Sequence, residues 1–350
     1  MSKLRLGVIF GGRSSEHEIS LLSATAIMRE AEKAGKYEIV PIGITKEGQW
    51  KSYTGDRGFL KVDWEKDAHP FNVGDLKEVV DFAFPVLHGP YGEDGTIQGL
   101  FEMLNIPYAG CSTLSSSVAM DKGIAKDLFS AKNIPQVKYL VVEKETYKGK
   151  DKELFLEKLG LPLFVKPANG GSSVGITKVK KKEDLEDAIA NAFLYDRRIL
   201  LERGVNAREI EVSVIGNNLR DYEVSAIGEI LPASEFYDYK AKYESEGRSK
   251  LLIPAELKKN EEEEIIRLAK EGFSAIDGEG FSRIDFFIDK DWGNIYLNEI
   301  NTIPGFTEFS MLPLLWKQRG VEFPELVMKI VGYGNERYSI KNSWSTDFHK

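Results

Sequence analysis

The first part of the chain alternates short apolar runs with amphipathic stretches. The apolar runs have strand length, the amphipathic stretches have helical periodicity, and they alternate along the chain: runs at 5–10, 37–45 and 81–87, and helical stretches at 16–34 and 96–104. Strands that alternate with helices are typical of βαβ units. This segment therefore predicts an α/β domain built on a doubly wound parallel sheet.

Ligands of such sheets bind beyond the carboxyl ends of the strands, and two glycine-containing loops qualify, 11–16 and 88–95. The first loop delivers Glu16 to a helix N-terminus, where it either contacts a ligand or only complements the helix dipole. The second begins with His88, which is either a ligand contact or a hydrogen-bonded structural histidine. No G-x-G-x-x-G follows the first strand and no G-x-x-x-x-G-K-[ST] occurs, which argues against dinucleotide and P-loop sites.

A glycine- and serine-rich loop, 168–173, lies between two predicted strands, 163–167 and 175–179. Its backbone N–H groups could hold phosphate oxygens, although such a loop taken alone is better explained as a flexible hairpin tip. Phe164 and Lys166 alternate onto one face of the first strand, so an aromatic ring and an ammonium group would line one cleft.

A second pair of runs, 199–202 and 207–214, is separated by an irregular break that contains Val205. The first run ends in Glu202 and the second carries Glu209. Backbone groups left free beside an acid could contact an adenine edge and a ribose hydroxyl.

The apolar runs 281–288 and 294–300 flank a polar turn, which predicts a β-hairpin. Alternation along the strands defines one face on each: Arg283, Asp285 and Phe287 on the first, Leu297, Glu299 and Asn301 on the second. A turn centred near residue 292 sets Asp285 opposite Glu299 and Arg283 opposite Asn301, with the carboxylates roughly 5 Å apart. Carboxylate and amide oxygens with positions left for phosphate suit Mg²⁺. The alternative is a surface ladder in which Arg283 neutralises both acids.

A long polar segment, 236–254, precedes this hairpin and is rich in lysine and tyrosine. Loops of this length inside a compact domain are usually functional, and its cations predict a lid over phosphates. A helix is expected at 256–274. After the hairpin, Pro304 and Gly305 predict a turn that aims a backbone N–H at a reacting centre.

The C-terminal part begins with Ser310, which is either a helix-capping residue or a substrate contact. Two amphipathic helices are predicted over 312–331, broken near Gly320 and Pro324. The tail 334–350 is polar, and we expect it to be mobile unless its aromatic residues dock.

Composition narrows the class of protein. The chain has 350 residues, 42% hydrophobic and 29% charged, which fits a globular enzyme of two or three domains; we predict domains at 1–115, 116–215 and 216–350. A net charge of −8 without a basic block argues against a nucleic-acid partner. The single cysteine, Cys111, and the lack of a signal peptide or membrane-length apolar run predict a cytoplasmic protein without a membrane partner.

Seven motifs together resemble the D-alanine–D-alanine ligase family of the ATP-grasp superfamily. In order they read GGRSSEHEIS, LHGPYGEDG, MDKGIAK, VKPANGGSSVG, FYDYKAKY, SRIDFF and NEINTIPG. The resemblance runs almost end to end. It implies an N-terminal substrate domain followed by an ATP-grasp fold of two α+β subdomains, a cytoplasmic homodimer, and the ligation of two D-alanine molecules with ATP and two Mg²⁺ ions, which Mn²⁺ can replace.

The resemblance also implies a role for individual residues. Around the substrates it implies a hydrogen-bonded triad of Glu16, Ser172 and Tyr243, a first-D-alanine contact at His88, an oxyanion hole of Arg283 and Gly305, and acceptor contacts at Ser310 and Met311. For ATP it implies Lys122, Lys166 and Lys242 at the phosphates, and Phe164, Glu202, Val205, Glu209 and Phe287 around the nucleoside. The implied metal ligands are Asp285, Glu299 and Asn301.

The sequence departs from the family pattern at two places, and two alternative functions remain. Gly170 stands where some family members have glutamate, and the tail 334–350 has no family role. The nearest alternative is another ATP-grasp ligase that uses D-lactate or D-serine as acceptor; Tyr243 argues against D-lactate. The other is a non-catalytic nucleotide sensor on the same fold.

Overall fold

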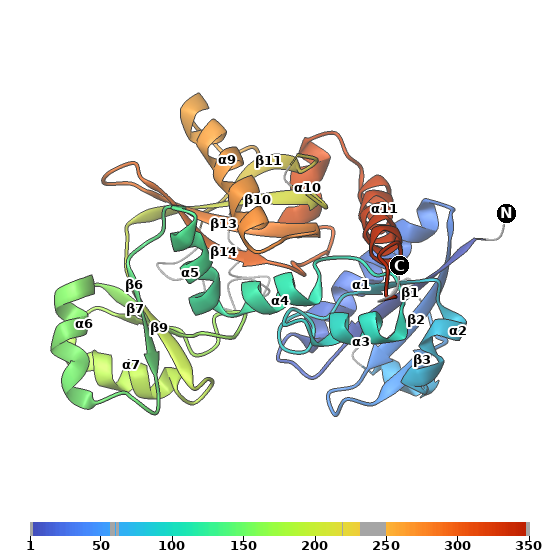
Figure 1. Ribbon diagram of the computed structural model, residues 1–350, viewed down its shortest axis with the longest axis horizontal. Coiled ribbons are helices and arrows are strands. Elements are labelled where there is room, and N and C mark those ends of the chain that lie inside the picture. The colour runs from blue at the N-terminus through green and yellow to red at the C-terminus, as the bar shows by residue number, and fades with distance from the viewer. Residues whose placement is uncertain (1–2, 57–59, 61–62, 219, 232–249, 348–350) are drawn as a thin grey trace.

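The computed structural model of the protein describes residues 3–56, 60, 63–218, 220–231 and 250–347, and contains three sheets that follow one another along the chain (Figure 1). The first sheet has the order β4-β3-β2-β1-β5. Its strands are β1 (Leu4–Gly11), β2 (Tyr37–Ile44), β3 (Trp50–Tyr53), β4 (Ala68–Pro70) and β5 (Phe82–Pro85). The predicted strands β1, β2 and β5 pair in parallel, whereas β3 and β4 add an antiparallel edge.

Both faces of the first sheet are covered, because the side chains of β1 alternate between two cores. Val8 and Phe10 pack with helix α1 (His17–Lys33) and helix α11 (Phe323–Asn342), whereas Ile9 packs with the other face's helices, α2 (Leu76–Val79) and α3 (Thr96–Leu104). A central parallel strand buried on both faces reads as a continuous apolar run, which is why β1 was recognisable in the sequence.

The second sheet is antiparallel, with the order β6-β9-β7-β8. Helices α4 (Thr113–Met120) and α5 (Lys122–Ala131) lead into it. Its strands and helices are β6 (Tyr139–Glu143), α6 (Lys152–Leu159), β7 (Leu163–Pro167), β8 (Thr177–Val179), α7 (Leu185–Ala192) and β9 (Arg198–Arg203). Helices α6 and α7 cover one face and form a separate core with it. Neither helix was predicted from the sequence.

The third sheet is also antiparallel, with the order β12-β11-β10-β13-β14. Its elements are β10 (Ala207–Gly216), β11 (Glu223–Leu231), β12 (Lys250–Leu252), α9 (Lys259–Ala275), β13 (Gly280–Asp289), β14 (Ile295–Asn301) and α10 (Met311–Gln318). Helix α9 packs on this sheet together with Phe129 of α5. Short 3-10 helices complete the described elements: Trp64–Asp67, Val73–Asp75, Gly149–Asp151 and Lys182–Asp184. The α/β class is confirmed, and the three domain boundaries remain predictions.

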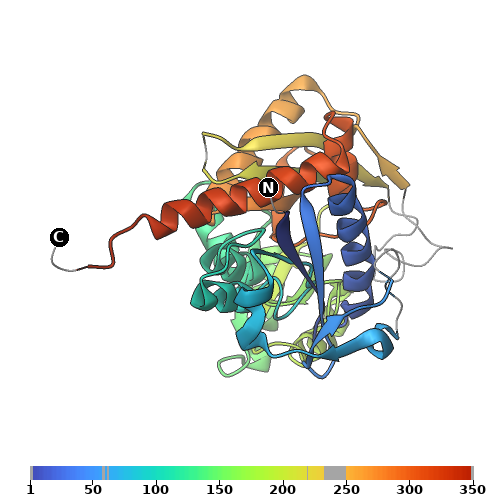
Figure 2. The same ribbon diagram turned by 90° about the vertical axis from the view of Figure 1, so that its right-hand side faces the viewer.

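The expectation of a mobile tail from residue 334 is wrong as far as Asn342, because α11 continues to that residue and lies along the N-terminal sheet (Figure 2). Arg337 is 8% exposed and donates hydrogen bonds to the backbone carbonyl oxygens of Gly110 and, at 3.0 Å, Tyr108. Its guanidinium carbon also lies 4.2 Å from the centre of the Tyr108 ring. A polar sequence concealed this contact, since an arginine can be buried when acceptors are present. After α11, Trp344 is 66% exposed, and Phe348 lies outside the described residues.

None of the helices in the described part of the chain is long and apolar enough to cross a membrane.

Candidate active site

The predicted hairpin is present as β13 and β14, with the expected register. Asp285 pairs with Glu299, and Arg283 pairs with Asn301. One detail of the prediction is wrong. The register shifts beyond Asp285, so that Phe286 pairs with Leu297, and Leu297 is buried in the core under α9 together with Ile300. A β-bulge of this kind inserts one residue and turns the following side chains to the other face.

Arg283 is the centre of a partly buried charge cluster. Its Nε and Nη2 donate to the two oxygens of Asp285, both at 2.7 Å, and its Nε lies 3.2 Å from Oε2 of Glu211 on the neighbouring strand β10. Burial alone would lower the pKa of Arg283, but Asp285 and Glu211 raise it well above its ordinary value. The guanidinium therefore stays charged. Sequence reasoning missed Glu211, although its two-residue spacing from Glu209 puts it on the same strand face.

The chemistry of this hairpin fits a divalent cation. Two carboxylates and the side-chain amide of Asn301 lie on facing positions, and Asn301 Nδ2 is 3.1 Å from Asp285 Oδ2. Among the described residues, no group of three or more His, Cys, Asp or Glu side chains gathers as a metal site. A cation held here would therefore depend on the amide oxygen and on oxygens of a bound ligand, as Mg²⁺ commonly does.

A hydrogen bond joins the first loop of the N-terminal sheet to the glycine-rich loop of the second sheet. Ser172 Oγ donates to Oε1 of Glu16, which is 8% exposed. Ser172 has a φ of 50°, and a Cβ added at Gly171 would lie 2.9 Å from Glu16 Oε2, so a side chain at Gly171 would displace the Glu16 carboxylate. Two members of the predicted triad are thus in contact. The third, Tyr243, lies outside the described residues, as does Lys242.

His88 is held by a buried hydrogen-bond chain. Its Nδ1 lies 2.9 Å from the carbonyl oxygen of Ile303, and its Nε2 lies 3.0 Å from Ser23 Oγ. Ser23 Oγ also accepts from the backbone N–H of Phe306 at 3.2 Å. Burial lowers the pKa of His88, so the ring is neutral, with its proton on Nδ1 facing the carbonyl. Sequence reasoning missed Ser23, which lies on the buried face of α1.

The turn after β14 has little room at Gly305, where an added Cβ would lie 3.0 Å from Ser310 Oγ. Ser310 Oγ accepts from the backbone N–H of Thr307 at 3.0 Å and makes no side-chain cap bond to helix α10. Ser310 therefore occupies the N-cap position of α10 in an extended conformation, as the capping alternative expects, but its hydroxyl makes no capping bond. The side chain of Met311 is buried with Ile230 and Leu315.

Lysines from two elements converge on Glu202. Lys166 Nζ lies 2.5 Å from Glu202 Oε2, and Lys126 Nζ lies 2.9 Å from Oε1. Lys122 Nζ donates to the carbonyl oxygen of Gly170 at 2.7 Å and lies 3.5 Å from Glu299 Oε2. Sequence reasoning missed Lys126; the signal available was its position four residues after Lys122, on the same helical face.

The remaining predicted nucleoside residues lie on neighbouring strands. Phe164 pairs with Glu202 across β7 and β9, and its ring centre is 5.8 Å from Lys178 Nζ. Glu209 pairs with Phe287 across β10 and β13, and Val205 lies in the connection after β9. Of the five predicted nucleoside residues, Glu202 is buried and the other four are partly buried.

A cavity of about 120 Å³ brings most of these groups together. Its lining includes Glu16, His88, Lys122, Ser172, Arg283, Glu299, Asn301 and Gly305. It also includes Glu93, which was not singled out from the sequence although it lies in the loop 88–95. Burial, and then the charge of Glu16, raise the pKa of Glu93 to about 8. Ser310 and Met311 are not among the lining residues.

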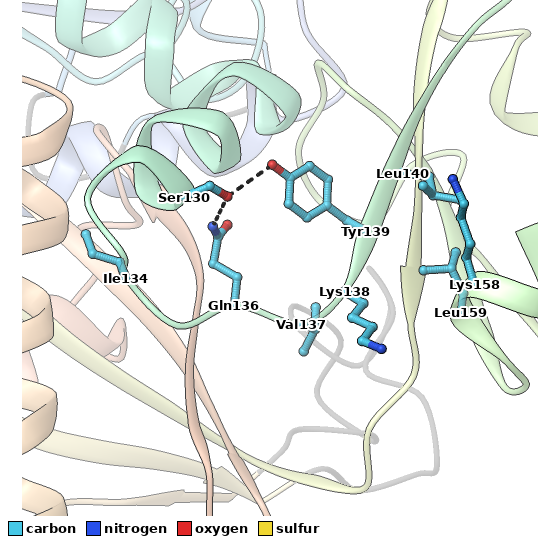
Figure 3. A pocket seen from close by; sticks show the side chains of 9 residues that line it. All are labelled: Ser130, Ile134, Gln136, Val137, Lys138, Tyr139, Leu140, Lys158 and Leu159. Atoms are coloured by element: carbon cyan, nitrogen blue, oxygen red, sulfur yellow. Dashed lines mark hydrogen bonds between the residues drawn. The ribbon is translucent and has the colours of Figure 1, made fainter.

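A second hollow, of about 470 Å³, lies away from these groups, between the α5–β6 connection and α6 (Figure 3). Ser130, Tyr139, Lys138 and Lys158 are among its lining residues, and it is wide open to solvent. It contains none of the predicted site residues.

Comparison with known proteins connects this geometry to a family. A model described as the D-ala D-ala ligase N-terminus matches residues 5–111, and one described as the D-ala D-ala ligase C-terminus matches residues 128–332. The chain is 46% identical over 360 residues to a D-alanine–D-alanine ligase of Thermoanaerobacter sp. (strain X514), covering 97% of this chain and 99% of the relative.

Two solved structures are similar over nearly the whole chain. The D-alanine–D-alanine ligase from Coxiella burnetii has a TM-score of 0.86 at 32% identity, over 98% of this chain and 97% of that one. The VanG D-Ala:D-Ser ligase from Enterococcus faecalis has a TM-score of 0.85 at 38% identity, over 95% of this chain and 100% of that one.

Proposed function

The chain belongs to the D-alanine–D-alanine ligase family, and from this premise we propose how its cleft performs the reaction. The protein is an ATP-dependent ligase that joins two D-alanine molecules, releasing ADP and phosphate, for peptidoglycan precursor synthesis. Its parallel-containing N-terminal sheet, followed by two further sheets, and its structural neighbours fit the predicted α/β domain followed by an ATP-grasp fold. The family, the fold class and the kind of enzyme are thus confirmed.

One observation supports the assignment of the site: a single cavity is lined by Arg283, Gly305, His88 and Glu16, next to Lys122 and Glu299. A cation and a backbone N–H suit a carboxylate and the oxyanion that develops from it. A neighbouring acid suits an ammonium group. This is the set of charges that two zwitterionic amino acids require.

The first step activates a carboxylate, which by itself is a poor acylating agent. The carboxylate of the first D-alanine, beside neutral His88, attacks the γ-phosphorus of ATP, so that an acyl phosphate forms and ADP leaves. Lys122 and Lys166, with Lys242 as a further prediction outside the described residues, would neutralise the phosphate charges, because phosphoryl transfer depends mainly on positioning and electrostatics.

In the second step, the free amine of the second D-alanine attacks the acyl carbon, and the proton that its nitrogen then loses is taken up by the departing phosphate. The C–N bond forms, the C–O bond to the phosphate breaks, and phosphate leaves. Arg283 and the N–H of Gly305 would stabilise the oxyanion, an effect worth roughly 3–4 kcal/mol per well-placed donor. Glu16, with Ser172 and the predicted Tyr243, would hold the second substrate's ammonium group.

The remaining residues have supporting roles in this proposal. Ser310 and Met311 would contact the acceptor's carboxylate, Met311 through its backbone because its side chain is buried. Glu202, Val205 and Glu209 would contact adenine and ribose between the walls of Phe164 and Phe287.

The reaction uses ATP and a divalent metal. We propose that the metal is Mg²⁺, as two ions that Mn²⁺ can replace, held by Asp285, Glu299 and Asn301, where it would supply positive charge to the phosphate oxygens. We further propose a cytoplasmic homodimer, which light scattering of the purified protein would test.

The deciding experiment is phosphate release from ATP with D-alanine, L-alanine, D-serine or D-lactate. D-Alanine alone should give sustained release and D-alanyl-D-alanine as the product. A D-serine acceptor is the second candidate, because a D-Ala:D-Ser ligase is 38% identical to this chain. Faster product formation from D-alanine plus D-serine than from D-alanine alone would favour it. ATP binding without release in any mixture would favour a nucleotide sensor.

A further inference from the structure

Behind the proposed phosphate lysines lies a buried lysine to which the reaction described above gives no role. Lys126 is on α5, and its side chain is 1% exposed. Its Nζ faces one oxygen of the Glu202 carboxylate at 2.9 Å, and Lys166 Nζ faces the other oxygen at 2.5 Å. Each oxygen of Glu202 is therefore paired with a different lysine.

The two lysines differ in what else they can reach. Lys166 is one of the proposed phosphate ligands, so nucleotide binding would draw it toward the phosphates. Lys126 is enclosed: its Nζ lies 5.5 Å from the centre of the Tyr139 ring. The Tyr139 hydroxyl donates a hydrogen bond to Asp127 Oδ1 at 2.8 Å. It also lies 3.4 Å from Ser130 Oγ (Figure 3), so β6 and α5 together hold the ring in place.

Because the Glu202 carboxylate is buried, its two lysine counter-ions decide whether it stays charged. A buried carboxylate is stable only while a positive charge accompanies it. When Lys166 binds the phosphates, Lys126 is the lysine of this pair that stays beside Glu202 as its counter-ion. The strand register agrees with these separate roles of the two lysines. Glu202 pairs with Tyr139, the ring beside Lys126, on one side, and with Phe164, a proposed wall of the nucleoside site, on the other.

We propose that Lys126 is a positioning residue that keeps Glu202 ionised and oriented as a hydrogen-bond acceptor for the exocyclic amino group of adenine, and thereby sets the preference for ATP over nucleotides with a carbonyl at that position. The inference rests on the proposed nucleotide role of Glu202. Lys126 itself touches no substrate and acts through Glu202.

The electrostatics agree with this role. Burial alone would raise the pKa of Glu202, but the charges of Lys126 and then Lys166 lower it to about 2. An ionised carboxylate only accepts hydrogen bonds, whereas a protonated one can also donate. Adenine presents an N–H donor at its 6-position and hypoxanthine presents a carbonyl acceptor. Removing Lys126 would permit Glu202 to take up a proton and so to tolerate hypoxanthine.

The test compares the full-length protein with Lys126→Met, which has a similar length and no charge. Calorimetry measures the dissociation constants for ADP and IDP, and steady-state assays measure KM and kcat with ATP and ITP. In Lys126→Met the preference for the adenine nucleotide should fall roughly tenfold or more, as expected when a charge-assisted hydrogen bond is lost. The change should lie in the KM for ATP, with kcat at saturating ATP within about threefold of the parent, since fold-changes below this are under 1 kcal/mol.

Two control variants distinguish a positioning role of Lys126 from a purely structural one. Lys126→Arg keeps the charge and should retain most of the preference. Lys132→Met removes an exposed lysine just after the same helix and should leave both constants unchanged. An unchanged ADP-to-IDP ratio in folded Lys126→Met would overturn the proposal.

A double variant keeps the proposal testable if Lys126→Met does not fold. In the Glu202→Gln variant, Lys126 no longer has a carboxylate to orient. Adding Lys126→Met to it should therefore not change the ratio of the ADP and IDP dissociation constants any further. A further change in the double variant would show that Lys126 acts independently of Glu202 and would overturn the proposal. These binding measurements do not depend on ligation, so a lack of D-alanine-dependent phosphate release would count against the proposed function alone.

Discussion

Glu16 and Ser172 are 156 positions apart in the chain, and the hydroxyl of Ser172 donates a hydrogen bond to the carboxylate of Glu16. The bond ties the N-terminal sheet to the glycine-rich loop of the second sheet. It therefore closes one side of the cavity in which Arg283 and His88 lie. Two residues that we propose to act at the second substrate, one from each sheet's loop, thus meet at this contact.

Ser172→Ala should weaken the use of D-alanine while nucleotide affinity stays the same. A hydrogen bond to a charged group contributes about 1.5–3 kcal/mol, so kcat/KM for D-alanine should fall roughly 10- to 100-fold. Steady-state kinetics with D-alanine varied, together with ADP calorimetry, measures both effects. Ser173→Ala is a matched control, because Ser173 has a φ of 61° in the same loop. Equal losses in the two variants would mean that the backbone of the loop, and not the Ser172 hydroxyl, is responsible.

Glu299→Gln should abolish turnover and leave the fold intact. The substitution removes one of the two facing carboxylates proposed to hold the divalent cation. Thermal unfolding with and without Mg²⁺ and ADP gives a second readout. Mg²⁺ and ADP together should raise the unfolding temperature of the parent, and Glu299→Gln should lose most of that stabilisation. Glu263→Gln, on the exposed face of α9, serves as the control. Near-normal activity of Glu299→Gln at saturating Mg²⁺ would remove the metal assignment.

Glu93 should make stability depend on pH between about 4.5 and 8. Its pKa is raised to about 8 in the folded protein, so the folded state retains a proton that the unfolded chain has already lost. The stabilisation is complete below the ordinary carboxyl pKa and is lost as pH rises through 8. Urea unfolding of Glu93→Gln across this range should show a smaller decline than the parent. Parallel curves for the two proteins would contradict the raised pKa.

Arg337→Met should destabilise the protein by about 2–4 kcal/mol, because two buried carbonyl oxygens lose their donor. The effect should appear in the free energy of unfolding, with little change in KM, since Arg337 is not among the residues that line the cavity. Arg319→Met, which removes an exposed arginine just after α10, is the control. A variant as stable as this control would show that α11 does not need the contact.

The local pattern of apolar and polar residues was sufficient to predict the structure where it depends on one strand or on two strands adjacent in the sequence. The apolar alternation and the polar turn predicted β13 and β14 with Asp285 opposite Glu299, because the two-residue period makes register errors costly. In the same way, the continuous apolar run at 5–10 predicted a strand of the parallel sheet, and β1 is that strand.

Tertiary structure decided what depends on elements far apart in the sequence. The bulge that buries Leu297 follows from packing against α9, and the contact that holds Arg337 requires the carbonyls of a distant loop. The pairing of Lys126 and Lys166 with one carboxylate arises only when α5, β7 and β9 come together. A lysine in a sequence is by default a solvated charge, and only the fold shows that Lys126 is enclosed and which acid accompanies it, because the free energy of a buried charge depends on the groups around it and not on its neighbours in the chain.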